Sequence, residues 1–299
     1  MLSVVIPTYN YSALPLVRAI HKQCEAAEIS YEIIVQDDGS TDFDTIEENQ
    51  TINKLSNCQF IQNEINLGRA KNINSLLKSA KFDWILLLDC DTKPTSENFI
   101  RNYDEIIQNS SSKIVFGGIA YRDTPPSENE VLRWKYGKER EAISAGKRNK
   151  NPYVTLLTSN ILCQKSVFKT VLFNENITEY GYEDLVFAQQ LEQHKIEIHH
   201  IENPVFHLNY ETSEAFLEKT EKSLQTLLFL EENKIIDATT TKLQKAYQRL
   251  KWWKLEGVFF SIFKKWKKKI IQNLLSPNPK LLYFDLYKLG YFIILKSKQ

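Results

Sequence analysis

The sequence lacks the features that mark several large classes of protein. Its four cysteines lie far apart and form no CxxC pair. This spacing argues against a structural zinc site and a disulfide framework, and it fits a reducing compartment. The N-terminal residues carry no basic segment, so we expect no secretory signal peptide. No run of about 20 apolar residues occurs, so the sequence predicts no membrane-spanning helix.

Acidic residues are scarce in one part of the chain. Residues 242–299 contain 14 Lys and Arg against 2 Asp and Glu, whereas the other 241 residues contain 24 basic and 35 acidic residues. The overall net charge of +1 hides this asymmetry. A shift of this size predicts a boundary near residue 240. The 299 residues, of which 42% are hydrophobic, are enough for a large α/β domain with an appendage.

Residues 84–88 are five consecutive apolar residues, followed directly by Asp89, Cys90 and Asp91. Such a run predicts a strand buried on both faces of a parallel sheet. Ligands bind beyond the carboxyl ends of these strands. In an extended chain the carboxylates of Asp89 and Asp91 would project to the same side, where they suit Mg²⁺ or Mn²⁺. Asp is also common in ordinary turns after strands.

The same order of apolar strand and polar turn recurs along the first part of the chain. Further strands are predicted at residues 2–6, 31–35 and near 59–61, with helices starting near residues 12–15 and 66–72. This alternation predicts right-handed βαβ units whose polar strand ends converge on one edge of a parallel sheet. Later elements are predicted at residues 113–118 (strand), 128–142 (helix), 158–162 (strand), from 183 (helix), 203–206 (strand) and 212–232 (helix).

Four stretches together carry a family resemblance. Val-Ile-Pro-Thr-Tyr-Asn at 5–10, Asp-Asp-Gly-Ser-Thr-Asp at 37–42, Asn-Leu-Gly-Arg-Ala-Lys-Asn at 66–72 and Leu-Asp-Cys-Asp at 88–91 resemble, in order and spacing, the family 2 glycosyltransferases. The resemblance implies the GT-A fold, an α/β Rossmann-like and mostly parallel sheet flanked by helices. It implies a catalytic domain at 1–240, with its nucleotide-binding half at about 1–120 and its acceptor half at about 121–240. A basic, aromatic helical extension at 241–299 lies outside the resemblance.

The resemblance also assigns roles around a UDP-, GDP- or dTDP-sugar donor and a Mn²⁺ or Mg²⁺ ion. It places the metal at Asp89, Asp91 and His207, although a lone histidine at a strand end is often only structural. The other residues that it places at the nucleotide sugar are Pro7, Thr8, Tyr9, Asp37, Asp38, Asn66, Gly68, Arg69 and Cys90, with Asp89 shared between the sugar nucleotide and the metal.

Glu183 and Asp184 form a second acidic centre. Gly181 precedes them, and helical spacing after it puts both in the first turn of a helix, where acids are favoured by the helix dipole in any case. The pair resembles the Glu-Asp motif of inverting GT-A enzymes, which implies that Asp184 is the general base and that Glu183 binds the acceptor. Tyr182 and Asn160 are the other predicted acceptor contacts. A carboxylate with an ordinary pKa is ionised at pH 7 and can accept a proton.

Two smaller features have alternative interpretations. Lys147, Arg148 and Lys150 are either part of a solvated loop or part of a mobile flap whose cations cover the diphosphate. His199 and His200 are adjacent, so their side chains should point to opposite faces of a strand, and we interpret both as non-catalytic.

The basic tail carries apolar residues at helical spacing. Three or four residues separate successive members of one apolar set, so the set would share one face of a helix, and the lysines would lie away from that face. The set is Trp252, Leu255, Phe259, Ile262, Trp266 and Ile270. One amphipathic helix of this kind can lie in a membrane interface and attract anionic lipids. The alternatives are packing on the catalytic domain or a second subunit, and nucleic-acid binding, which we do not expect. The resulting expectation is a cytoplasmic protein attached peripherally to the inner face of a membrane.

The function predicted from the sequence is metal-dependent, inverting transfer of a sugar to a hydroxyl of a glycan or lipid-linked saccharide. A sugar-phosphate nucleotidyltransferase would need a glycine-rich basic loop after the first strand, where Pro-Thr-Tyr-Asn stands at 7–10. A catalytically inactive saccharide-binding or scaffold relative is the third hypothesis. The presence of Asp89, Asp91 and Asp184 argues against it.

Overall fold

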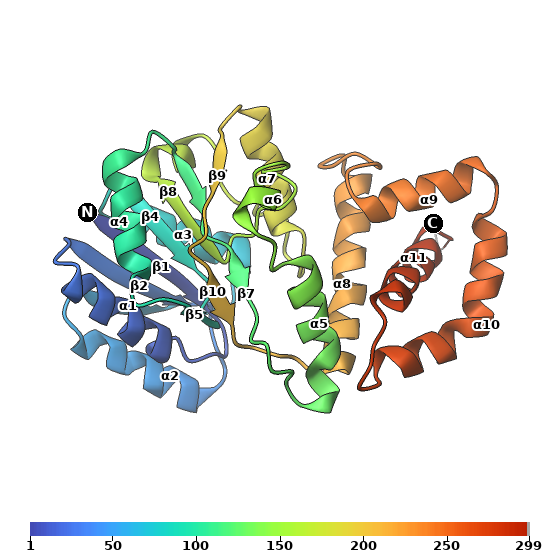
Figure 1. Cartoon of the computed structure of the whole chain (residues 1–299), viewed down its shortest axis with the longest axis horizontal. Helices are drawn as coiled ribbons and strands as arrows, with labels where there is room; N and C mark the ends of the chain where they lie inside the picture. Colours follow the sequence, from blue (N-terminus) through green and yellow to red (C-terminus); the bar gives the residue numbers. More distant parts are fainter. Residues whose placement is uncertain (298–299) are drawn as a thin grey trace. The chain divides into compact units, whose positions relative to one another are not determined.

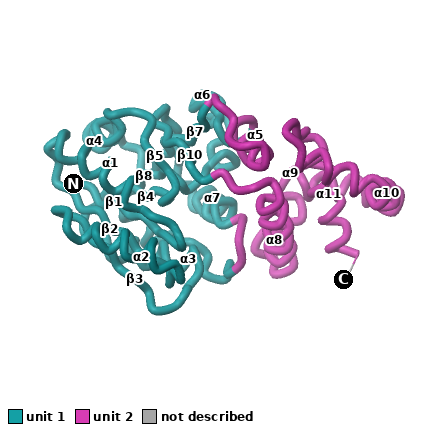
Figure 2. Tube along the Cα trace, turned by 90° about the horizontal axis from the view of Figure 1, so that it is seen from below, with its two compact units in different colours: residues 1–122, 140–178, 183–209 teal, residues 123–139, 179–182, 210–299 magenta. Residues whose placement is uncertain are grey.

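The computed structural model describes residues 1–297, which form two compact units (Figures 1 and 2). Unit 1 contains most of the first 209 residues and both sheets, and unit 2 is helical. Unit 1 comprises residues 1–122, 140–178 and 183–209, and unit 2 comprises residues 123–139, 179–182 and 210 onward. The two units are defined by how compactly their residues pack and not by function. The predicted boundary near residue 240, between the catalytic domain and the tail, therefore stays a prediction.

The main sheet of unit 1 has seven strands in the order β3-β2-β1-β4-β8-β6-β9. The first four pair in parallel, β8 runs antiparallel to both of its neighbours, and β9 is parallel to β6. The predicted α/β fold with a mostly parallel sheet is therefore confirmed. The strands are β1 (Leu2–Thr8), β2 (Tyr31–Asp37), β3 (Cys58–Gln62), β4 (Trp84–Leu88), β6 (Ile114–Phe116), β8 (Asn160–Gln164) and β9 (Ile198–His200).

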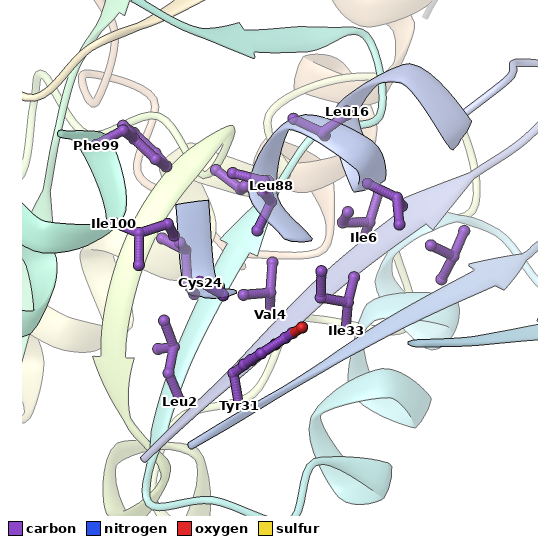
Figure 3. Close-up of a cluster of buried hydrophobic side chains, with 14 of the residues drawn as sticks. Leu2, Val4, Ile6, Leu16, Cys24, Tyr31, Ile33, Leu88, Phe99 and Ile100 are labelled. Carbon is purple, nitrogen blue, oxygen red and sulfur yellow. The ribbon is translucent and has the colours of Figure 1, made fainter. Parts of the chain in front are cut away.

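Helices cover both faces of this sheet, because its strands are apolar on both sides. Val4 packs with helices α1 and α4, whereas its neighbour Val5 packs with α3 and α7 on the opposite face. Figure 3 shows part of the first cluster, with Val4 and Ile33 among its side chains. The helices and 3₁₀ turns of unit 1 are α1 (Leu14–Ala26), α2 (Phe43–Gln50), η1 (Thr51–Lys54), α3 (Arg69–Ser79), α4 (Phe99–Asn109), α6 (Ala145–Arg148), η3 (Lys165–Lys169) and α7 (Glu183–Gln193).

A second sheet in unit 1 joins segments that are far apart in the sequence. Its order is β5 (Thr92–Pro94), β10 (Val205–His207) and β7 (Ile119–Ala120). Because β10 runs antiparallel to β5, His207 lies opposite Thr92. This pairing brings His207 beside the residue that directly follows Asp91.

Unit 2 is built from helices around an aromatic core. Phe216, Phe263, Phe284 and Tyr287 are buried in this core. Gly290 is required on α11, because a Cβ there would lie 2.4 Å from the Phe263 ring. The elements are η2 (Glu128–Glu130), α5 (Val131–Arg140), α8 (Ser213–Glu232), α9 (Lys242–Trp252), α10 (Glu256–Leu274) and α11 (Leu281–Ser297).

The single amphipathic helix predicted for the tail is wrong. The chain leaves the helix after Trp252 and starts α10 at Glu256, with Lys254 at φ 55° between them. Ile270 is buried, whereas Trp252 and Trp266 are exposed, so the predicted face does not act as a unit. Within residues 1–297 no helix combines the length and apolar content needed to cross a membrane.

Candidate active site

Four side chains connect the end of β4 to the start of α7. Arg69, the first residue of α3, donates from Nη2 to Oδ1 of Asp89 across 2.7 Å and to the Thr158 hydroxyl across 3.4 Å. Thr158 donates to Oδ1 of Asp184 across 2.5 Å. The structure thus brings together Asp89, Arg69 and Asp184, which the sequence assigned to one site. Glu183 begins α7 beside Asp184, and Tyr182 precedes it with φ at 69°.

The charges in this cluster oppose one another. Burial raises the pKa of Asp184 to about 6, while Arg69 and the Thr158 hydroxyl act in the opposite direction and Glu183 and Asp89 add to the rise. Burial lowers the pKa of Arg69, but Asp89, Asp184 and Glu183 outweigh it and raise the pKa above its usual value. Asp184 is therefore a carboxylate whose pKa lies closer to neutral pH than usual, beside a guanidinium that stays charged.

Asp89 and Asp91 face different partners. The extended geometry expected for residues 89–91 is wrong, because β4 ends at Leu88 and Thr92 donates from both its amide and its hydroxyl to the Asp89 carbonyl. Asp91 Oδ2 lies 3.4 Å from Nε2 of His207 instead. The His207 ring in turn stacks on Tyr121, with 5.6 Å between ring centroids.

Asp91 and His207 supply one carboxylate, which suits Mn²⁺ or Mg²⁺, and one imidazole, which is a transition-metal ligand and therefore favours Mn²⁺. Within the described residues, 1–297, no three His, Cys, Asp or Glu side chains stand together as a ready cluster for a metal ion. This is compatible with Mg²⁺-type sites, which use one or two protein ligands together with water and substrate phosphates. The fit of a divalent ion is thus partial and centres on Asp91 and His207.

Asp37, the last residue of β2, and Asp38, which follows it, organise the loops around them. Asp38 accepts from the amides of Leu67 and Gly68 at 2.9 and 3.0 Å, and Asp37 accepts from the Ser40 amide at 2.9 Å. Gly39 has φ of +72°, and a Cβ there would lie 2.6 Å from the Asn66 amide nitrogen. The carboxylates that the sequence assigned to the nucleotide are therefore buried and hold the two loops together.

The remaining residues assigned to the donor lie at the ends of β1 and β4 and in the loop before α3. Thr8 is buried and donates to the Tyr11 carbonyl at 2.7 Å, next to buried Pro7, while Tyr9 is exposed. Cys90 lies in the turn after β4, and burial raises the pKa of its thiol to about 12, so it remains protonated. Asn66 is exposed and accepts from the Gly68 amide.

The sequence model of "Glycosyl transferase family 2" matches residues 3–172. The chain belongs to this family. It is 28% identical over 226 residues to "Chondroitin synthase" of Escherichia coli, covering 64% of this chain and 32% of that protein. It is 32% identical over 184 residues to "Poly(ribitol-phosphate) beta-glucosyltransferase" of Bacillus spizizenii, covering 58% and 26%. The chain thus spans less than a third of the length of these two relatives.

Solved structures of glycosyltransferases share the fold. The mannosyltransferase PcManGT from Pyrobaculum calidifontis, in complex with GDP-Man and Mn²⁺, aligns with a TM-score of 0.59 at 12% identity, covering 99% of this chain and 86% of that one. S. aureus TarS 1-349 with UDP aligns with a TM-score of 0.51 at 18% identity, covering 100% and 92%. The GT-A fold expected for a family 2 member is confirmed.

Two residues of this family member do not have the positions that the sequence suggested. Asn160 is fully buried and bonds to Tyr103 and to the carbonyls of Gly118 and Asn203, so the predicted acceptor contact is wrong. Arg148 belongs neither to a solvated loop nor to a mobile flap. It is 2% exposed and donates to the carbonyls of Ile143, Gly117 and Ile201, and its guanidinium lies over the Phe116 ring.

Sequence reasoning missed Thr158. It lies in the predicted strand at residues 158–162, and its bond to Asp184 joins residues 26 positions apart. A weak signal was present, because Thr158, Ser159 and Asn160 form a buried polar run at the entry to an otherwise apolar strand. Buried polar groups need hydrogen-bond partners.

Proposed function

We propose that this family 2 member transfers a sugar, with inversion, from a nucleotide sugar to a hydroxyl of a saccharide or lipid-linked acceptor, in a divalent-metal-dependent reaction. One observation carries the proposal: Asp184 connects to Asp89 through Thr158 and Arg69. A candidate base and the donor-side carboxylate therefore belong to one hydrogen-bonded network. Such an arrangement suits a reaction in which one group accepts a proton while another part of the site stabilises a leaving group.

On the donor side, the proposal assigns the diphosphate to the surroundings of Arg69. A guanidinium recognises phosphate oxygens well because its N–H groups form a planar fork. Asp91 and His207 would hold the divalent ion, which when bound supplies positive charge to the diphosphate leaving group. The loops fixed by Asp37 and Asp38 would then form the seat of the base and ribose, beside the end of β1.

On the acceptor side, Asp184 would take the proton of the attacking hydroxyl. Because Thr158 donates to Oδ1, Oδ2 would be the oxygen that accepts the proton. The acceptor oxygen forms the new bond to the anomeric carbon as the bond from that carbon to the diphosphate breaks, and attack from the opposite side inverts the centre. Glu183 and Tyr182 would contact the acceptor. A general base of this kind typically contributes about 10²–10⁴-fold to the rate.

The comparisons support this proposal over its alternatives. The two relatives are named as a chondroitin synthase and a poly(ribitol-phosphate) beta-glucosyltransferase, which favours a polymeric carbohydrate acceptor. The structural neighbours were solved with UDP and with GDP-Man and Mn²⁺, which favours a nucleotide-sugar donor and a divalent ion. Nothing in them favours sugar-phosphate nucleotidyl transfer. A lipid-linked acceptor would place the enzyme at the cytoplasmic face of a membrane.

The test combines binding and turnover. UDP-, GDP- and dTDP-sugars are screened with Mn²⁺ for a rise in melting temperature, which a tight ligand causes by mass action. Release of nucleoside diphosphate is then measured for the wild type and for Asp184→Asn. We expect one donor class to stabilise both proteins and only the wild type to turn over efficiently.

Glu192→Gln is the matched control, because Glu192 is an exposed carboxylate on the same helix, α7. It should keep wild-type turnover. The proposal fails if no nucleotide sugar stabilises the protein, or if Asp184→Asn turns over as fast as the Glu192→Gln control.

A further inference from the structure

Exposed apolar side chains gather on α9, α10 and the turn between them. Six of the fifteen large exposed apolar residues within 1–297 fall between residues 252 and 266, and each is 46% to 74% exposed. We call this set the tryptophan stripe. It consists of Trp252, Trp253, Leu255, Val258, Ile262 and Trp266. Single exposed apolar residues need no explanation, but a contiguous set marks an interaction surface.

Helix α10 carries more apolar surface than its own unit covers. Phe263, Ile270 and Leu274 are buried in the core of unit 2. Val258, Ile262 and Trp266 are exposed, although Ile270 and Leu274 continue the same spacing of four residues towards the end of the helix. The apolar surface of the first half of α10 is therefore left to meet a partner outside this unit.

A basic hollow adjoins the stripe. It has a volume of about 570 Å³ and shares Trp252 with the stripe. Its lining residues are Thr239, Lys245, Gln248, Arg249, Lys251 and Trp252. Lys245, Arg249 and Lys251 are exposed, so three cations line one shallow hollow. Convergent cations with hydroxyl and amide groups suit a phosphate group.

Positive charge continues along the stripe. Residues 251–269 contain seven lysines and one acidic residue, Glu256. Nζ of Lys269 lies 4.7 Å from the centre of the Trp266 ring, so charge and aromatic surface are interleaved. Tryptophan with lysine on an exposed helix is the composition of a membrane-interface segment. Figure 1 shows α9 and α10 as consecutive helices in the orange part of the chain, and Figure 2 shows both in unit 2.

We propose that the tryptophan stripe and the basic hollow form a docking site for an anionic lipid bilayer. The stripe enters the boundary between headgroups and acyl chains, and the hollow takes the phosphate of a lipid headgroup. The positive charge beside the stripe favours an anionic bilayer over a second copy of the chain, because a two-fold contact would bring two lysine-rich faces together. The site goes beyond sugar transfer and does not depend on it.

The test measures co-sedimentation of the full chain with vesicles of phosphatidylglycerol and phosphatidylcholine. We expect binding to the anionic vesicles that weakens as salt rises, and little binding to phosphatidylcholine alone. The triple variant Lys245→Gln/Arg249→Gln/Lys251→Gln removes three cations and should weaken binding on the order of 100-fold. Val258→Ser/Ile262→Ser/Trp266→Ser should bind at least as weakly, because it removes the inserted apolar surface.

Matched controls use exposed residues of unit 1. Phe43→Ser/Val154→Ser removes exposed apolar surface, and Lys54→Gln/Lys78→Gln/Lys113→Gln removes three exposed lysines. Both should bind anionic vesicles like the wild type. Because every substituted side chain is exposed, all variants should fold, and an unchanged melting temperature checks this. Release of nucleoside diphosphate without vesicles separates failure of this site from failure of the proposed sugar transfer.

Three results would overturn the proposal. In the first, the stripe variant sediments with anionic vesicles as strongly as its control. In the second, inorganic phosphate at millimolar concentration binds the hollow, whereas vesicles do not bind at all. In the third, light scattering shows that the wild type is a dimer and the stripe variant a monomer, and the wild type does not bind vesicles of either composition.

Discussion

The hydroxyl of Thr158 donates to Oδ1 of Asp184 across 2.5 Å, which joins the entry of β8 to the first turn of α7. This bond engages one oxygen of the Asp184 carboxylate. It also lowers the pKa of Asp184 against the larger, opposing effect of burial. Thr158 is thus a positioning residue for the proposed base, and its contribution can be measured through the base.

Thr158→Val keeps the shape of the side chain and removes the hydrogen bond. We expect the pKa of Asp184, which burial raises to about 6, to rise further. The base works when ionised, so wild-type kcat/KM should fall as pH drops through about 6, and the variant should lose activity at a higher pH. Profiles of kcat/KM between pH 5 and 8.5 check this. Thr158→Ser should restore the wild-type profile, and a uniform loss at every pH would contradict the prediction.

Arg69→Met removes the cation between the two carboxylates. Two effects are expected, because Arg69 bonds to Asp89 and also lowers the pKa of Asp184. The KM for the donor should rise by about tenfold or more, as expected from the loss of a charge-assisted bond. The acidic limb of the kcat profile should move to higher pH. Arg69→Lys keeps the charge, so the acidic limb of the kcat profile should stay closer to its wild-type pH than the donor KM stays to its wild-type value. A change in neither quantity would remove Arg69 from the site.

The sequence predicted the sheet well because its strands have a simple physical signature. Consecutive apolar residues such as Val4 and Val5 pack on opposite faces, so a strand covered on both sides has no polar alternation. The motif residues Arg69, Asp89 and Asp184 were found for a different reason, namely a family pattern. Their mutual contacts could not be predicted, because these depend on how α3, β4 and α7 meet in space.

The errors also have physical causes. Arg148 lies among Lys and Asn residues that look solvated, and only the fold shows the carbonyl groups that surround it. The break between α9 and α10 has no proline or glycine at residues 253–255 to signal the end of a helix. The left-handed residue at this break is Lys254. Local sequence therefore favoured a continuous helix that the tertiary structure does not form.

Arg148→Met tests whether Arg148 is structural. The substitution leaves the carbonyls of Ile143, Gly117 and Ile201 without the donor that joins them. Leaving a buried acceptor without its donor typically costs about 1–3 kcal/mol. We expect a loss of this size in the free energy of unfolding, measured by urea denaturation, with little change in donor KM for the folded protein. The exposed Lys150→Met is the control and should leave stability unchanged. A raised donor KM at unchanged stability would favour the flap interpretation instead.

Chelation with EDTA is expected to abolish turnover, and added Mn²⁺ to restore it. The structure predicts unequal effects for the three ligands expected from the sequence, because Asp91 faces His207 whereas Asp89 is bound to Arg69. Asp91→Asn and His207→Gln should each raise the Mn²⁺ concentration needed for half-maximal recovery by about 10–100-fold, on the scale seen when support for a bound metal is lost. Asp89→Asn should change it less and should weaken donor binding instead. Thermal-shift titration of Mn²⁺ with nucleoside diphosphate gives a readout that is independent of turnover. Equal effects of all three substitutions would mean that Asp89 leaves Arg69 and joins the metal when the donor binds.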